Sequence, residues 1–471
     1  MCLLCDFGIT AFATTAAMVA PMFAAGGRSA TSSKLPPRGE FIVKNAYVFT
    51  MDPQLGEIDN GSVHVRDGAI VGVGRDVDAP GATAIDGRGM IVLPGLVDTH
   101  WHMWQTLYRC FAGEQADKGF FPTITRFSAH MTPQDMYASA RLSAAEALHC
   151  GITTVHDWCH NTRSREHPEG DLRALAEVGI RAHFSVGQRI DQPDDTLMPL
   201  DIVKAIHADW KNYSNDGLIT LGMAWRGMFR NSWAPPEIYR PEFECARGLK
   251  LPISVHVGTL TSRTGHVAAH YKEKLLGPDV NIVHACSASP DEIKMIKDSG
   301  ASVSILSLSE MRGGWGMPLL TELLDAGIPT SLGVDSVGII GNCNLFGLLK
   351  FAAAIENGKA LNEFKFTSRR MLSLGTIEAA KILGIDDKVG SLTPGKRADI
   401  VMVSTDALNM APFTDPANML IESTQPENVD TVVVDGRILK QGGKLTAIET
   451  SEVMRDAQTS LQDVRKRAAW K

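Results

Sequence analysis

The chain has 471 residues, of which 44% are hydrophobic and 21% charged, and its formal net charge is -7 at pH 7. This composition is typical of a folded globular protein and argues against a fibrous or disordered chain. Basic residues are mixed with acidic ones and form no stripe that would neutralise a phosphate backbone, so nucleic acid is not an expected partner. The length favours a barrel of roughly 250 residues with a smaller accessory domain.

Residues 1–39 form a separate N-terminal segment with an uncharged apolar run from Phe7 to Gly26. Such a run is similar to the hydrophobic part of an export signal, but Asp6 stands where a signal usually carries Lys or Arg. We therefore expect a cytoplasmic protein, with export as the alternative. No later run is apolar and long enough to span a bilayer, so no membrane association is expected. The eight scattered cysteines, which include Cys2 and Cys5, favour reduced thiols.

Short β-rich runs occur near both ends of the chain. The N-terminal runs are residues 41–43, 46–49, 63–65 and 70–73, and the C-terminal runs are residues 399–403 and 431–436. Neither group is large enough to fold alone. We expect residues 40–94 and 390–447 to combine into one small β-sandwich, followed by a C-terminal segment, residues 448–471, with an amphipathic helix over residues 451–468.

Residues 95–389 contain eight further β-like runs, most of them separated by helical patterns. The runs are Leu96–Thr99, Ile152–His156, Arg181–Val186, Leu218–Ala224, Pro252–His256, Val280–His284, Ser302–Leu306 and Pro329–Asp335. Successive runs start about 33 residues apart, close to the roughly 31 residues of one unit in a 250-residue barrel. Thr132, Pro133 and Asp135 mark the capped start of one intervening helix. The pattern predicts an α/β fold, a (β/α)₈ TIM barrel.

Polar side chains stand at the ends of several predicted strands. His100 and His102 follow the first strand, His256 ends the fifth, His284 ends the sixth and Asp335 ends the eighth. The C-terminal strand ends of such a barrel open onto one face, where active sites are built. Because residues i and i+2 of a strand point to the same side, His100 and His102 can both face inward.

Three imidazoles and one carboxylate are a suitable ligand set for one divalent metal. Zn²⁺ is the first expectation, with Fe²⁺, Mn²⁺ and Co²⁺ as alternatives. A set of this size leaves one coordination position for water, which is typical of a catalytic site. The sequence therefore predicts an enzyme that hydrolyses its substrate with a metal-activated water.

Four motifs resemble those of the amidohydrolase superfamily over about residues 40 to 440. They are Pro94–His102 (PGLVDTHWH), Gly151–Val155 (GITTV), Ser331–Asp335 (SLGVD) and Gly390–Asp399 (GSLTPGKRAD). The set is similar to the branch that contains triazine hydrolases and the cytosine, guanine and S-adenosylhomocysteine deaminases. The resemblance implies one metal bound by His100, His102, His256 and Asp335, with His284 directed at the water or the substrate. Binuclear branches usually carry a carboxylated lysine on the fourth strand, and residues 218–225 contain no lysine.

One position departs from the pattern of the resembling deaminases. They carry a glutamate three residues after the fifth-strand histidine, and this chain has Thr259 there. Because threonine does not transfer a proton near neutral pH, the proton needs another carrier. Asp335 is a candidate base and His284 a candidate for polarising the substrate. Glu310 is a candidate replacement acid, with a solvated loop carboxylate as its alternative reading.

The catalytic candidates are therefore Asp335, His284 and Glu310, and four residues just beyond the first two strands are expected to bind substrate: Trp104, Gln105, Trp158 and His160. The leading prediction is hydrolysis of an amide, urea, carbamate or similar carbon–heteroatom bond in a small aromatic or heterocyclic compound. The alternatives are an aminohydrolase that releases ammonia from a heterocycle, and a non-catalytic relative that only binds a small molecule. We further expect a homo-oligomer.

Overall fold

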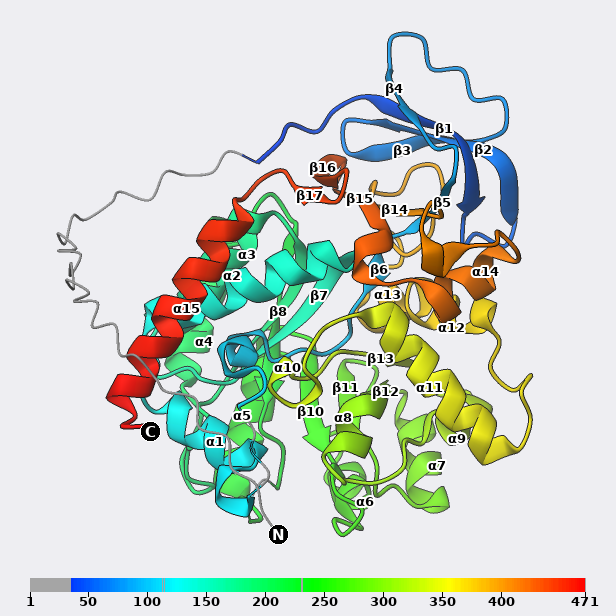
Figure 1. Ribbon diagram of the computed structural model, residues 1–471. Helices are drawn as coiled ribbons and strands as arrows, with labels where there is room; N and C mark the ends of the chain where they lie inside the picture. The colour runs from blue at the N-terminus through cyan, green and yellow to red at the C-terminus, as the bar shows by residue number, and fades with distance from the viewer. Residues whose placement is uncertain (1–34, 112, 114, 230–231, 471) are drawn as a thin grey trace, which may run out of the picture. The chain divides into compact units, whose positions relative to one another are not determined.

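The computed structural model describes residues 35–111, 113, 115–229 and 232–470. The signal-like run from Phe7 to Gly26, with Cys2 and Cys5, lies outside these described residues. Two sheets organise the rest of the chain, one of eight strands and one of nine (Figure 1).

The eight-stranded sheet is the barrel that the sequence predicts. Its strands are β6 (Leu96–Val97), β7 (Ile152–Cys159), β8 (Arg181–Gly187), β9 (Ile219–Trp225), β10 (Ile253–Val257), β11 (Val280–His284), β12 (Ser302–Ile305) and β13 (Thr330–Leu332). Each strand pairs in parallel with its neighbour in chain order. The predicted (β/α)₈ fold is thereby confirmed.

The gap between the first and last barrel strands is closed by the segment that follows β6. Trp101 forms parallel bridges to Asp157 on one side and to Asp335 on the other. The N–H of His102 donates to the carbonyl of Asp335 at 2.6 Å, and the N–H of Asp335 donates to the carbonyl of His100 at 2.7 Å. The backbone between His100 and His102 is thus part of the barrel wall.

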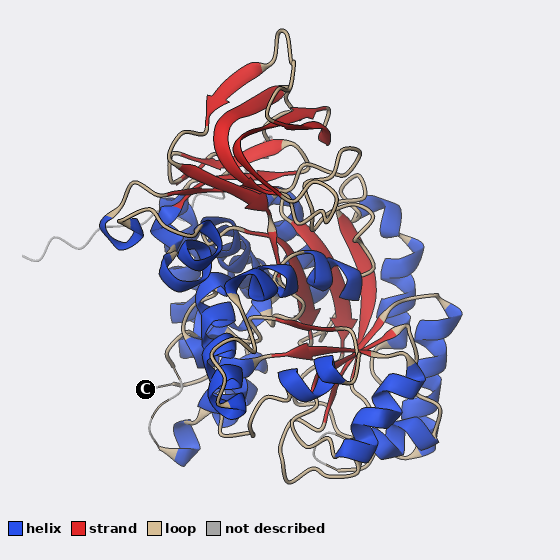
Figure 2. Ribbon diagram, turned by 90° about the vertical axis from the view of Figure 1, so that its right-hand side faces the viewer, coloured by secondary structure: helices blue, strands red, loops and turns tan. Residues whose placement is uncertain are grey.

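Helices flank the barrel strands (Figure 2). They are α1 (Phe120–Ser128), α2 (Pro133–His149), α3 (Glu166–Val178), α4 (Leu200–Ala208), α5 (Pro236–Gly248), α6 (His266–Lys272), α7 (Pro290–Ser299), α8 (Ser307–Arg312), α9 (Leu320–Asp325), α10 (Val337–Ile340), α11 (Leu345–Ala360), α12 (Ser368–Leu374) and α13 (Ile377–Ile382). Helix α2 begins as the sequence predicts: the hydroxyl of Thr132 accepts from the N–H of Asp135, whose carboxylate accepts from the N–H of Thr132.

The second sheet is built from both ends of the described chain. Its strands are β1 (Phe41–Phe49), β2 (Glu57–Arg66), β3 (Ala69–Gly74), β4 (Thr83–Asp86), β5 (Met90–Pro94), β14 (Ile400–Ser404), β15 (Val429–Val434), β16 (Arg437–Gln441) and β17 (Lys444–Leu445). Strands β5 and β14 pair antiparallel and join the two halves. A single hydrophobic cluster contains side chains from both halves, among them Phe41, Val92 and Ile400. The predicted union of the two terminal segments is confirmed, as one continuous mixed sheet.

Two further α-helices lie in the described C-terminal part of the chain, α14 (Pro416–Asn418) and α15 (Thr450–Arg467). The buried side of α15, which includes Val453 and Val464, packs against α2. The Ser460 hydroxyl donates to Asp135 at 2.6 Å, so the packing is also polar. Along the described part of the chain, no helix combines the length and apolarity needed to cross a membrane.

A buried ion pair fastens the barrel to the terminal sheet. The guanidinium of Arg181, at the start of β8, donates two hydrogen bonds of 2.8 and 2.9 Å to the carboxylate of Asp399, just before β14. The exposed fractions of the two side chains are only 6% and 1%. The N–H of Asp435 also donates to Asp399. Breaking such a pair leaves a charge that water cannot reach.

We expect the substitution Arg181→Met to lower the free energy of unfolding by about 3–5 kcal/mol, because Asp399 would stay buried without its cation. Urea unfolding followed by circular dichroism measures the change. The control Arg66→Met removes the cation of an exposed pair with Glu40 and should cost no more than about 1 kcal/mol. Equal stability of the two variants would contradict this role of the Arg181–Asp399 pair.

Candidate active site

His100 and His102 stand at the C-terminal end of β6, where the barrel closes. Their Nε2 atoms lie 3.2 Å apart, which agrees with the expectation that both side chains face inward. The Nδ1–H of His102 donates to the carbonyl of Trp158 at 3.2 Å. This hydrogen bond turns Nε2 of His102 toward the centre of the barrel mouth, as is usual for a histidine that binds a metal.

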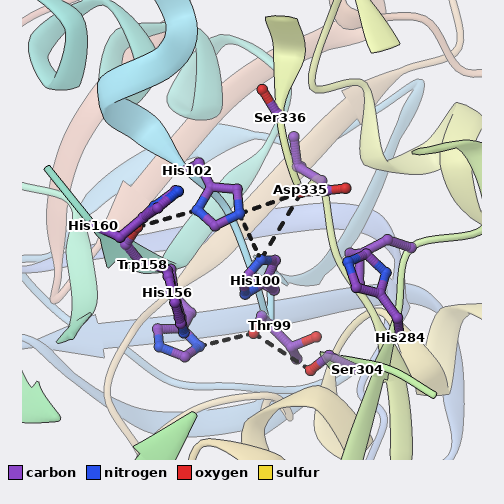
Figure 3. Close-up of polar contacts among 12 residues, drawn as sticks. Thr99, His100, His102, His156, Trp158, His160, His284, Ser304, Asp335 and Ser336 are labelled. Atoms are coloured by element: carbon purple, nitrogen blue, oxygen red, sulfur yellow. Dashed lines mark hydrogen bonds and ion pairs between the residues drawn. The ribbon is translucent and has the colours of Figure 1, made fainter. Parts of the chain in front are cut away.

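His256 and Asp335 complete the group. His256 lies on β10, and its ring centroid is 4.8 Å from that of His100 and 5.2 Å from that of His102. Oδ1 of Asp335 is 3.5 Å from Nε2 of His102 and 3.9 Å from Nε2 of His100 (Figure 3). Possible ligand atoms of His100, His102 and His256 all lie within 4.8 Å of one another. The tertiary structure therefore brings together four residues that the sequence spreads over more than two hundred positions.

Burial controls the charge of this group. It lowers the pKa of His102 to about 3 and holds the pKa values of His100 and His256 well below the usual value. Burial also raises the pKa of Asp335 to about 6. The imidazoles are therefore neutral at physiological pH and offer lone pairs, which is the form that binds a metal.

Buried polar atoms without hydrogen-bond partners are a second feature that fits a divalent metal. Oδ2 of Asp335 and Nδ1 of His100 are buried and have no hydrogen-bond partner within the described ranges. A carboxylate and three neutral imidazoles form a ligand set that suits zinc and related cations. The donor set and the unpartnered Asp335 oxygen both agree with such an ion.

The backbone is strained at two of the strand ends. His284 has φ 78° and Asp335 has φ 67°, both in the left-handed region that residues other than glycine rarely occupy. Conformations of this kind cost free energy and are concentrated at functional sites. The neighbouring hydrogen bond from the Asp335 N–H to the His100 carbonyl, 2.7 Å long, holds Asp335 in place.

A second polar group lies beside the first one. Nδ1 of His284 donates to Oε1 of Glu310 at 3.2 Å, and the same oxygen accepts from the N–H of Leu306 at 3.0 Å. Cys286 belongs to this group, with possible ligand atoms of all three residues within 4.8 Å. Burial, followed by the nearby Glu310, raises the pKa of the Cys286 thiol. His284 is thus fixed on one side by a carboxylate.

A cavity of about 700 Å³ opens over these residues, a size that suits a small organic ligand. His102, His256, His284 and Asp335 line it together with aromatic side chains, which are Phe120, Phe121, Trp158, Phe229 and Trp315. Phe121 and Trp315 are stacked, with ring centroids 5.9 Å apart. Aromatic walls of this kind favour a flat, ring-shaped ligand.

The residues that we expected to bind substrate lie at different depths. Gln105, Trp158 and His160 line the cavity. Trp104 is fully buried behind them, and its indole N–H donates to Nδ1 of His160 at 3.1 Å. Trp104 therefore supports His160, because its own surface is covered by its neighbours.

Thr259 and its candidate replacement in proton transfer, Glu310, also differ in position. Thr259 lines the cavity. Glu310 lies in α8, is fully buried, and is not among the residues that line the cavity. The alternative reading of Glu310 as a solvated loop carboxylate is wrong, because His284 and the N-terminal end of α8 enclose it.

Several lining residues could not be found from the sequence. Phe120 and Phe121, at the start of α1, line the cavity from a segment far from the strand-end motifs. Arg263 lies in the loop between β10 and α6. None of these positions carries a local pattern that would distinguish it from other loop residues, since loop conformation alone brings them to the cavity.

Comparison with known proteins agrees with this site. The model of the amidohydrolase family matches residues 91–439. The chain is 28% identical over 446 residues to the 5'-deoxyadenosine deaminase of Methanosarcina mazei, covering 90% of this chain and 98% of that protein. It is 26% identical over 428 residues to the 5-methylthioadenosine/S-adenosylhomocysteine deaminase of Acetivibrio thermocellus, with 88% and 96% covered.

Two solved structures share the fold. One is an atrazine chlorohydrolase from Arthrobacter aurescens complexed with zinc, with a TM-score of 0.79, 24% identity and coverage of 89% of this chain and 100% of that one. The other is an adenosine deaminase from Xanthomonas campestris with bound zinc, with a TM-score of 0.77, 20% identity and coverage of 92% and 100%. The family model covers most of the sequence, which confirms the resemblance seen in the motifs. The chain therefore belongs to the amidohydrolase family and is a hydrolase that acts on carbon–nitrogen bonds.

Proposed function

We propose that this enzyme hydrolyses an exocyclic carbon–nitrogen bond on a nitrogen heterocycle and releases ammonia or a small amine. The observation that carries the proposal is the group of three neutral imidazoles and one carboxylate at the floor of an aromatic cavity of about 700 Å³. The relatives named as deaminases of adenosine derivatives support a heterocyclic substrate.

His100, His102, His256 and Asp335 would hold one divalent cation, and zinc fits these ligands. When bound, the cation supplies a Lewis acid that activates water near neutral pH. Strand β9, the fourth of the barrel, reads ITLGMAW and contains no lysine that could bridge a second ion. A single metal is therefore part of the proposal.

Hydrolysis must also move one proton from the attacking water to the departing nitrogen. Oδ2 of Asp335 is buried and has no partner in the described part of the chain, so it is available to accept that proton. His284 faces the cavity beside Asp335. With Nδ1–H donated to Glu310, the other nitrogen of His284 is directed away from Glu310 and can hold or give a proton.

Glu310 acts through His284 in this proposal. It fixes the orientation of the imidazole and stabilises the ring when it carries a positive charge, because the carboxylate lies 3.2 Å from Nδ1. Thr259 lines the cavity but has a hydroxyl pKa far above neutrality, so it serves at most as a hydrogen-bond partner of the substrate. Glu310 is therefore a positioning residue.

A second candidate is hydrolysis of an amide, urea or carbamate at the same site. The absence of a glutamate at position 259 favours it, because cleavage of an acyl–nitrogen bond does not require protonation of a ring nitrogen. A screen of the zinc-reconstituted enzyme with aminopurines, aminopyrimidines, aminotriazines, amides, ureas and carbamates separates the two candidates. Products identified by mass spectrometry show whether the cleaved bond is on a ring or on an acyl carbon.

We expect the purified enzyme to bind one divalent ion per chain, because His100, His102, His256 and Asp335 are the one set in the described part of the chain that joins three neutral imidazoles to a carboxylate. Chelation should abolish turnover, and added zinc should restore it. Elemental analysis gives the stoichiometry. Two tightly bound ions per chain would instead assign His284, Cys286 and Glu310 to a second metal.

The two cavity histidines on β10 and β11 are expected to differ in metal binding. His256→Ala should lose most of the bound zinc, because it removes one of the proposed ligands. His284→Ala should retain the zinc and lose turnover, because it removes only the proposed proton carrier. The zinc content of both variants after dialysis tests this difference, and equal loss would show that the division of roles is wrong.

Glu310→Gln is expected to lower kcat by about 10- to 100-fold, the value of a hydrogen bond to a charged group, because it removes the charge that stabilises the protonated ring of His284. Thr259→Val should cost about fivefold at most, the value of one hydrogen bond. Glu356→Gln is the control, because Glu356 is equally buried but lies on α11 and binds Thr321 and Lys359. Severe loss in Thr259→Val with normal rates in Glu310→Gln would reject the proposed proton route.

A further inference from the structure

Most charged side chains that line the cavity have a partner of opposite charge. Asp194 lies 2.8 Å from the guanidinium of Arg226, and Asp191 lies 2.7 Å from that of Arg163. Asp335 faces the imidazoles of His100 and His102. Arg263 differs, because no acidic side chain in the described ranges forms an ion pair with it. Among the described residues that line the cavity, Arg263 is therefore a cation without a counter-charge.

The backbone around Arg263 is held in place. Its N–H donates to the carbonyl of Leu260 at 2.8 Å, and its carbonyl accepts from the hydroxyl of Ser287 at 2.7 Å. The guanidinium carbon lies 5.1 Å from the ring centroid of Phe229, another lining residue. The cation is thus fixed over an aromatic face, while its N–H groups keep their capacity to bind a ligand.

The position of Arg263 is electrostatically unfavourable. Its side chain is partly buried, and burial without a compensating carboxylate lowers its pKa. The same cation contributes to lowering the pKa values of His256 and His266. An arginine remains protonated under these conditions. A desolvated guanidinium is stabilised when a ligand brings an oxyanion to it.

We infer that Arg263 binds an oxyanion group, a carboxylate or a phosphate, on the substrate of this enzyme. The inference rests on the proposed function and narrows its substrate class to heterocycles that carry an anionic substituent. The ring lies against the aromatic walls, its scissile bond faces His284 and Asp335, and its anionic group lies toward the loop between β10 and α6. The guanidinium can donate two parallel hydrogen bonds to such a group.

Ligand binding to the zinc-loaded enzyme tests this inference without requiring turnover. Trp158 and Trp315 line the cavity, so quenching of tryptophan fluorescence reports on occupancy. The probes are benzoate, phenyl phosphate and acetophenone, which is a neutral analogue of benzoate. Arg263→Gln removes the charge, Arg263→Lys retains it without the planar fork, and Arg66→Gln is a control at an exposed position on β2.

We expect Arg263→Gln to weaken binding of benzoate or phenyl phosphate by about 10- to 100-fold, the contribution of hydrogen bonds to a charged group. Acetophenone binding should change much less, and Arg66→Gln should behave like the wild-type enzyme. Arg263→Lys should recover part of the loss. If benzoate binding is weakened more, the anionic substituent of the substrate is a carboxylate, and if phenyl phosphate binding is weakened more, it is a phosphate.

Three results would overturn the inference: equal loss of benzoate and acetophenone binding in Arg263→Gln, unchanged binding of both anions in that variant, or no saturable binding of either anion to the wild-type enzyme. The first would assign Arg263 to packing. Unchanged binding of both anions would show that they bind to groups other than Arg263, such as the metal. These binding measurements do not depend on catalysis. Failure of the substrate screen would therefore reject the proposed function, whereas anion binding at Arg263 would be tested separately by the binding measurements.

Discussion

The closure of the barrel is the constraint on which the site depends. Trp101, in the segment that follows the first strand, bridges to Asp157 on the second strand, β7, and to Asp335 just after the last strand, β13. Because the intervening residue of a strand faces away from its two neighbours, this pairing directs His100 and His102 to the inside. The carboxylate of Asp98 accepts from the N–H of Val334 at 2.7 Å and holds the same seam. Closure of the barrel therefore also brings together three of the four proposed metal ligands, His100, His102 and Asp335.

Burial at this seam has a chemical consequence as well. The low dielectric around the strand ends keeps the imidazoles of His100, His102 and His256 neutral and raises the pKa of Asp335. The same environment makes unpartnered polar atoms costly. The strained backbone at His284 and Asp335, and a buried Asp335 oxygen that has no hydrogen-bond partner among the described residues, therefore lower the stability of the fold at the place where chemistry is proposed.

The residues proposed for proton transfer and for substrate recognition lie at different depths of the cavity wall. Glu310 lies behind His284, to which it is hydrogen-bonded, and in the proposed mechanism it acts through the imidazole. Trp104 similarly lies behind His160. Arg263 is at the cavity surface, in a loop that the strand pattern does not restrict. Rigid strands thus position the proposed reacting groups, whereas loops set the proposed preference for substrate, a division that is general in this barrel architecture.

The sequence by itself determined the barrel, the pairing of its two terminal segments and the strand ends that carry His100, His102, His256 and Asp335. These features depend on local periodicity and on motifs that report which residues end a strand. Only the tertiary structure decided that Glu310 is enclosed behind His284 and that Trp104 is behind the cavity wall. It also decided that Arg263 lines the cavity and forms no ion pair with a described residue. Burial and pairing depend on neighbours that are distant in the chain, and a sequence pattern carries no record of how loops place those neighbours.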